Sequence, residues 1–118
     1  MTGEKMIDEF ARNGSLLELY GGLLTEKQRE ILELYYIENW SLAEIAEYLK
    51  ISRQGVYDIL QRAIRQLNLY EEKLGLLRKN EQKMAQYNNI LTKMQELLGE
   101  DNYKLLVPYF EEIKNLFD

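Results

Sequence analysis

Apolar residues recur at helical spacing on both sides of a short interruption, Lys50-Ile51-Ser52. On each side they fall three and four residues apart, which predicts two amphipathic helices. The first row is Leu42, Ile45, Ala46 and Leu49, and the second is Val56, Ile59, Leu60, Ala63, Ile64 and Leu67. Because only three residues separate the two helices, they must meet at a steep angle. The pattern predicts a helix-turn-helix, whose second helix can enter the major groove of DNA.

Each of these two helices has its own start signal. Ser41, followed three residues later by Glu44, predicts a capping box in which two backbone N–H groups are satisfied reciprocally. The hydroxyl of Ser52 can cap the second helix by accepting from the amide of residue 54 or 55. Lys50 stands where the corner often needs a positive φ, at a cost of about 1 kcal/mol for a residue other than Gly.

Upstream of this unit the pattern predicts two further helices. Gly14 interrupts a weakly helical start, and Ser15 is expected to cap a short helix over 16–20. Thr25 and Gln28 form a second predicted capping box, which opens a helix over roughly 26–38.

Downstream the helical pattern continues to about residue 98. Large side chains recur every seven residues, at Tyr70, Leu77, Met84, Leu91 and Leu98. An amphipathic helix of this length needs a partner surface. Two alternatives stay open: it packs back on its own chain, or it pairs with a second copy in a homodimer. Gly75 is a candidate break in this helix.

Residues 99–118 form a helical tail in this interpretation. Gly99 ends the long helix, Asp101 or Asn102 is expected to cap a last helical segment, and Pro108 is expected to open the final helix over 108–117. The predicted fold class is all-α, with a single helical domain over 1–118. It comprises a helix-turn-helix core at 15–66, a long helical extension at 67–98 and the tail at 99–118.

Composition excludes several classes of function. The chain has 118 residues, with no Cys and no His, so it lacks a thiolate nucleophile, the commonest metal ligand and the commonest general base. We therefore expect no catalysis, no cofactor and no metal site. No apolar run reaches 18 residues, and the start lacks a signal-peptide pattern. We expect a cytoplasmic protein that does not contact the membrane.

The net charge of −5 is unevenly distributed along the chain. Residues 50–79 carry 7 basic and 3 acidic groups, whereas 1–49 carry 4 basic and 10 acidic groups, and 80–118 carry 4 and 7. Phosphate binding depends on local positive charge, so the second helix of the unit remains suited to nucleic acid. The acidic flanks are the main evidence against a simple DNA-binding function.

The candidate DNA-binding residues lie at the corner and on the outward face of the second helix. Side chains on this face could reach base edges, where arginine can pair with guanine, glutamine with adenine and aspartate with cytosine. The remaining basic side chains and the capping serine hydroxyl can bind phosphates. These candidates are Lys50, Ser52, Arg53, Gln54, Tyr57, Asp58, Gln61, Arg62 and Arg65. Arg53 and Gln54 are the strongest of them, because the first turn of a recognition helix reaches base edges.

Two resemblances support this interpretation. Residues 23–63, LLTEKQREILELYYIENWSLAEIAEYLKISRQGVYDILQRA, resemble region 4 of bacterial sigma factors and the related LuxR-type readers. The longer run from Leu16 to about Gln82 is similar to the YlxM family of small bacterial helix-turn-helix proteins, through the segments SLAEIAE, SRQGVYD and YEEKLGL. Gly55 stands where that family usually has Ala. The resemblance implies a cytoplasmic regulator in the signal recognition particle pathway.

Three functions remain open on the sequence alone. The first is sequence-directed binding to duplex DNA. The second is binding to the RNA or the protein of the signal recognition particle, because a positive helix can lie on the phosphates of structured RNA without reading bases. The third is a helical adaptor that works through its long helix.

Overall fold

The computed structural model describes residues 3–116, and the side chains from residue 8 onward. Every regular element in that range is helical, which confirms the predicted all-α class. The elements are α1 (Gly3–Tyr20), the 3₁₀ turn η1 (Gly21–Leu23), α2 (Glu26–Leu32), the π-helical turn η2 (Glu33–Ile37), α3 (Leu42–Leu49), α4 (Arg53–Leu74), α5 (Leu76–Leu98) and α6 (Glu100–Asn115).

The chain divides into two compact units, 1–78 and 79–118, with the boundary inside α5. The expected single domain over 1–118 stays a prediction, and residues 1–2 and 117–118 lie outside the described part.

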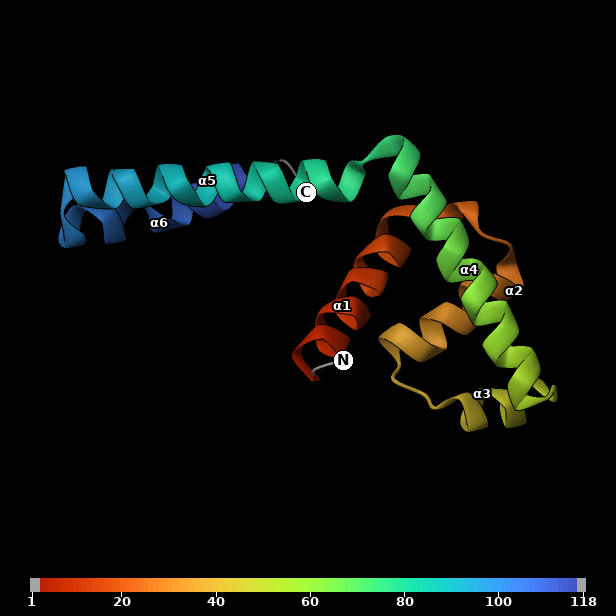
Figure 1. The fold of residues 1–118 in the computed structure, drawn as a ribbon. Coiled ribbons are helices and arrows are strands. Elements are labelled where there is room, and N and C mark those ends of the chain that lie inside the picture. Colours follow the sequence, from red (N-terminus) through yellow and green to blue (C-terminus); the bar gives the residue numbers. More distant parts are fainter. Residues whose placement is uncertain (1–2, 117–118) are drawn as a thin grey trace. The chain divides into compact units, whose positions relative to one another are not determined.

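In the first unit α1, α2 and α3 all pack against α4 (Figure 1). The apolar rows predicted from the sequence meet in one core, and its largest fully buried side chains come from all four helices. The fully or nearly fully buried residues are Leu16, Leu17, Tyr20, Ile31, Leu32, Ile45, Ala46, Val56, Leu60, Ala63 and Leu67.

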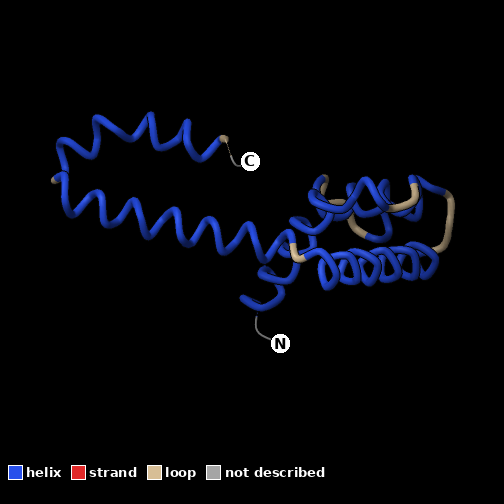
Figure 2. The backbone as a smooth tube through the Cα atoms, turned by 90° about the horizontal axis from the view of Figure 1, so that it is seen from above, coloured by secondary structure: helices blue, strands red, loops and turns tan. Residues whose placement is uncertain are grey.

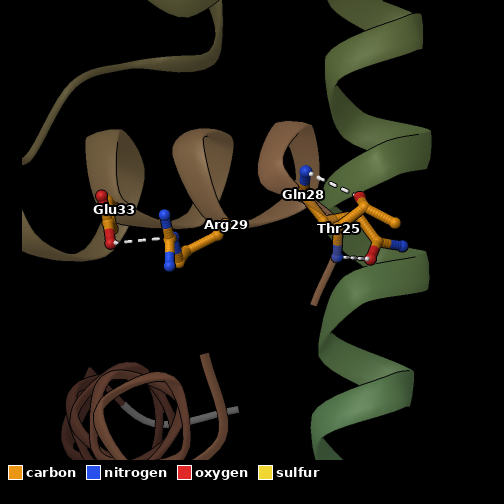
Figure 3. A network of polar contacts seen from close by, with 4 residues as sticks. All are labelled: Thr25, Gln28, Arg29 and Glu33. Carbon is orange, nitrogen blue, oxygen red and sulfur yellow. Dashed lines mark hydrogen bonds and ion pairs between the residues drawn. The ribbon is translucent and has the colours of Figure 1, made fainter. Parts of the chain in front are cut away.

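The start of α2 confirms the second predicted capping box (Figure 3). The amide of Gln28 donates to the hydroxyl of Thr25 at 3.2 Å, and the amide of Thr25 donates to the side-chain oxygen of Gln28 at 3.1 Å. One turn further on, Arg29 and Glu33 form an ion pair at 3.7 Å, with both side chains about half exposed. The capping box fixes where α2 begins.

Helix α2 widens at its end into the π-helical turn η2. The amide of Glu38 donates to the carbonyl of Glu33, five residues back, at 3.0 Å. The wider turn brings both Tyr35 and Tyr36 against Phe10 of α1, with ring centroids 5.8 Å and 4.8 Å from that of Phe10. The buried amide of Asn13 donates to the Tyr36 hydroxyl at 3.1 Å. The irregular end of α2 is therefore packed by aromatic contacts to α1.

The prediction of a separate short helix over 16–20 is wrong. Helix α1 runs without a break from Gly3 to Tyr20 and passes through Gly14. Burial of Leu16, Leu17 and Tyr20 against α4 outweighs the poor helix propensity of a single glycine, which costs about 1 kcal/mol.

Helices α4 and α5 are separate, because the chain turns at Gly75 with φ +63°. The first amides of α5 are capped from a distance. The hydroxyl of Tyr20 accepts from the Leu76 amide at 3.1 Å, and the carboxylate of Glu71 accepts from the amides of Leu77 at 2.9 Å and Arg78 at 3.1 Å. Tyr20 also donates to Glu71 at 2.8 Å. The long predicted helix therefore breaks at the candidate glycine.

Partial burial acts to raise the pKa of Glu71, but the amide of Leu77, the hydroxyl of Tyr20 and the amide of Arg78 outweigh it. The pKa of Glu71 is therefore held below its ordinary value. Burial raises the pKa of Tyr20, and its bond to Glu71 raises it further, so the hydroxyl stays protonated and can donate.

The second unit consists of α6 and the part of α5 from Lys79 onward, and α6 runs back along α5 in the opposite direction (Figure 2). Phe110 is the one buried side chain among its described residues. The Tyr87 hydroxyl of α5 donates to the carbonyl oxygen of Phe110 in α6.

The predicted start of the last helix is wrong. Helix α6 begins at Glu100, directly after Gly99, and neither Asp101 nor Asn102 caps it. Pro108 lies inside the helix although it removes one backbone donor. The rings of Tyr103, before the proline, and Phe110, after it, lie in a tilted contact with centroids 5.4 Å apart, and this contact joins the helix on both sides of Pro108.

Two glycines give a matched test of the backbone. A Cβ at Gly14 would meet nothing within 4 Å and its φ is not positive, so Gly14→Ala should stabilise the protein by about 1 kcal/mol. Gly75→Ala should destabilise it by about 1–2 kcal/mol, because φ is +63° there. Urea unfolding of both variants measures the two effects, and a loss of stability in Gly14→Ala would contradict the continuous α1.

The cap at the start of α5 makes stability depend on pH. A carboxylate whose pKa is lowered by folding stabilises above its unfolded pKa of about 4.3, and this is lost as pH falls through the folded value. Glu71→Gln should therefore lower stability at pH 7 by about 1 kcal/mol and show a shallower loss in acid. Glu72→Gln, exposed and one residue away, is the control. Equal effects of both variants in thermal unfolding at pH 7 and pH 3 would contradict the assignment.

Candidate nucleic-acid interface

The corner between α3 and α4 is built by backbone geometry. Lys50 adopts φ 58° and ψ 44°, as its position in the sequence predicts, and its amide donates to the carbonyl of Ala46. The amide of Ile51 donates to the same carbonyl at 3.1 Å. These bonds close the end of α3 in the manner of a left-handed helix cap, and α4 starts three residues later.

Both predicted caps of the unit are present. The Ser41 hydroxyl accepts from the Glu44 amide at 3.1 Å, and the Glu44 carboxylate accepts from the Ser41 amide at 3.0 Å. The backbone bond from Ser41, aided by its hydroxyl, lowers the pKa of Glu44. The Ser52 hydroxyl accepts from the Gly55 amide at 2.9 Å. A Cβ at Gly55 would lie 3.1 Å from that hydroxyl, so the glycine leaves the cap uncrowded.

A shared apolar wedge holds the two helices at their crossing. Ile45, Ala46 and Val56 are buried, and the small side chain of Ala46 lets the two helices approach closely. Leu49, Ile51 and Ile59 are partly buried and pack against the core beside them. These contacts fix which side of α4 faces outward.

The outward side of the corner and of α4 carries the predicted site residues. Eight of the nine are exposed, and Gln61 is half-buried: Lys50, Ser52, Arg53, Gln54, Tyr57, Asp58, Arg62 and Arg65 are the exposed ones. None of the cations among them forms an ion pair in the described part of the chain, where the pairs are Arg29–Glu33 and Lys104–Glu100. The site's cations are therefore free to meet an anionic ligand.

One contact of this face was not predicted. The side-chain amide of Gln54 donates through Nε2 to Oδ1 of Asp58 at 2.9 Å, one helical turn along α4. Glutamine and aspartate four residues apart on a helix commonly bond in this way, so the spacing itself was a usable signal.

A second surface lies between α5 and α6 within the second unit. It is a groove of about 540 Å³ whose floor is apolar and whose charged residues are both lysines. It is lined by Asn80, Lys83, Met84, Gln86, Tyr87, Ile90, Leu91, Met94, Phe110, Ile113 and Lys114.

Acidic side chains do not gather into a metal site within the described residues, where no group of three or more is arranged to hold an ion. No described helix combines the length and the apolar character that crossing a bilayer requires.

Comparison with known proteins places the chain in a family. Residues 7–106 match the UPF0122 family, described as "Putative helix-turn-helix protein, YlxM / p13 like". A UPF0122 protein of Caldanaerobacter subterraneus is 53% identical over 85 residues, which cover 72% of this chain and 73% of the relative. One of Thermoanaerobacter sp. is 43% identical over 108 residues, 92% of each chain. One of Geobacillus kaustophilus is 49% identical over 78 residues, 66% and 71%. This chain belongs to the UPF0122 family of YlxM/p13-like helix-turn-helix proteins.

Proposed function

We propose that this protein is a non-enzymatic regulator that binds duplex DNA through α4. The observation that carries the proposal is the exposed, unpaired row of cations on the outward side of a complete helix-turn-helix. In this geometry the second helix lies in the major groove with its first turn against base edges.

Phosphate contacts and base contacts come from different parts of the face. Lys50 and Ser52 at the corner, with Arg62 and Arg65 further along α4, are proposed to meet phosphates and set the register. The Ser52 hydroxyl accepts within its cap and keeps its proton for a phosphate oxygen. Arg53, Gln54, Tyr57, Asp58 and Gln61 are proposed to face the bases.

A second candidate is the RNA of the signal recognition particle, which the resemblance to the YlxM family implies. The acidic excess of 1–49 and of 80–118 opposes loose binding along any nucleic acid, so this candidate requires docking to one structured RNA. Docking to one structured RNA would use the same cations without base readout.

We further propose that the protein acts as a homodimer joined through α5 and α6. Phe110 alone is buried among the described side chains of residues 79–116, whereas Leu97 is 86% exposed and Leu105 72% exposed. So much exposed apolar surface on a two-helix unit favours a partner.

The spacing on α5 favours a second copy as that partner. Lys83, Ile90 and Leu97 lie seven residues apart and so share one face of α5. Ile90 is half exposed, and we place a two-fold axis beside it, so that the α5 helices of the two copies run antiparallel. Leu97 of each copy then lies level with Lys83, which lines the groove of the other copy. The same axis brings the groove lysines level with the hairpin turn that carries Glu96, Glu100 and Asp101.

The double variant Arg53→Ala/Gln54→Ala tests DNA reading. Each lost base contact should cost about 1–3 kcal/mol and remove preference for the selected sequence, while Arg62→Ala should weaken binding to every sequence and lower the salt slope by about one. Fluorescence anisotropy across a salt series measures the sequence preference and the salt slope. The ligands are duplexes selected from a random pool and signal recognition particle RNA. Arg29→Ala on α2 is the control.

Three outcomes of that titration decide between the candidates. Sequence preference lost only in the double variant supports DNA reading. Tight binding to the RNA, with the double variant unchanged and DNA bound weakly, favours the second candidate. Binding to neither nucleic acid rejects both and leaves a helical adaptor.

Sedimentation tests the dimer independently of nucleic acid. The double variant Ile90→Glu/Leu97→Glu should shift the protein from dimer to monomer, because it sets carboxylates into an apolar contact. Asn88→Glu/Gln95→Glu sets the same two carboxylates at exposed positions on another face of α5, and this control should stay dimeric. A wild-type chain that sediments as a monomer at tens of micromolar would refute the proposed dimer.

A further inference from the structure

We infer that Asp58 positions Gln54, so that the glutamine amide reads an adenine in the bound site. The inference rests on the proposed DNA binding. It concerns the hydrogen bond between two side chains of the exposed face of α4. Both residues are exposed, and Gln54 Nε2 lies 2.9 Å from Asp58 Oδ1.

The chemistry of the pair fixes the orientation of the amide. A carboxylate accepts hydrogen bonds and donates none, so the amide must turn its NH₂ group toward Asp58 and its oxygen away. An unrestrained glutamine amide can rotate by half a turn and offer either a donor or an acceptor at the same place. The bond to Asp58 removes that choice.

The groups that remain on Gln54 match one base. One N–H and the Oε1 oxygen are left, and together they suit the N7 acceptor and the N6 amino donor that adenine presents in the major groove. Guanine presents two acceptors, N7 and O6, so the fixed Oε1 would face another acceptor there. The pair therefore favours adenine and disfavours guanine.

A simpler role must be separated from this one. Glutamine and aspartate four residues apart stabilise an isolated helix slightly, and a role limited to helix stability would leave base preference unchanged. Replacing Asp58 also removes a negative charge near phosphates, which changes the affinity for both duplexes by a similar factor. The informative quantity is thus the ratio of the affinities for two duplexes that differ only in having adenine or guanine at the position read by Gln54.

The experiment uses the full-length protein and duplexes selected from a random pool. Once the wild-type site is known, the adenine whose preference Gln54→Ala abolishes is replaced by guanine, and the affinity ratio of the two duplexes is measured. The wild-type ratio should be on the order of tenfold or more. Asp58→Asn should reduce this ratio severalfold, because asparagine can bond either end of the amide and no longer fixes which group of Gln54 faces the base.

Two further variants make the result specific. Asp58→Glu keeps the carboxylate and should retain most of the ratio. Glu47→Gln removes one exposed negative charge from α3 without touching Gln54, so it should raise affinity for both duplexes and leave the ratio unchanged. Urea unfolding checks that all variants are equally folded.

The outcomes separate this inference from the proposed function. If wild type selects a sequence but the ratio is unchanged in Asp58→Asn, DNA binding stands and the positioning role is wrong. If Gln54→Ala alters preference for a base other than adenine, the assigned base is wrong. If wild type selects no DNA sequence, the proposed function fails and the inference with it.

Discussion

The left-handed backbone at Lys50 is the constraint on which the rest of the first unit depends. A lysine in that conformation is disfavoured by about 1 kcal/mol relative to glycine. The hydrogen bonds from the backbone amides of Lys50 and Ile51 to the carbonyl of Ala46 hold it there. The bend sets the crossing of α3 and α4, and the buried wedge of Ile45, Ala46 and Val56 keeps it. Because that wedge takes the inward side of α4, the polar residues of the helix are left to face outward.

Local signals in the sequence were sufficient for the helix-turn-helix. Ser41, Thr25 and Ser52 each cap the helix that they precede, because a cap depends on residues no more than three positions away. The strained residue of the corner was also predictable, because Lys50 directly follows the last apolar residue of α3, where a left-handed helix cap falls. The exposure of most of the candidate site residues was predictable from the same register.

The errors occur where distant contacts override local preference. Gly14 and Pro108 both suggest a helix boundary, but α1 and α6 continue past them because residues on both sides are packed. The capping of α5 joins residues that are far apart in sequence, Tyr20 with Leu76, and no local pattern indicates such a pair. The bond between Gln54 and Asp58, by contrast, lay within one turn, and helical spacing alone could have suggested it.

The start of α5 has a consequence for how the chain folds. Its leading amides find their acceptors on α1 and α4, so this helix cannot be nucleated with full hydrogen bonding by its own residues. The ring of Tyr20 must first be seated between its neighbours in the core. During synthesis, Leu76 and Leu77 emerge long after that tyrosine, so an already assembled amino-terminal core can serve as the template on which the following helix begins.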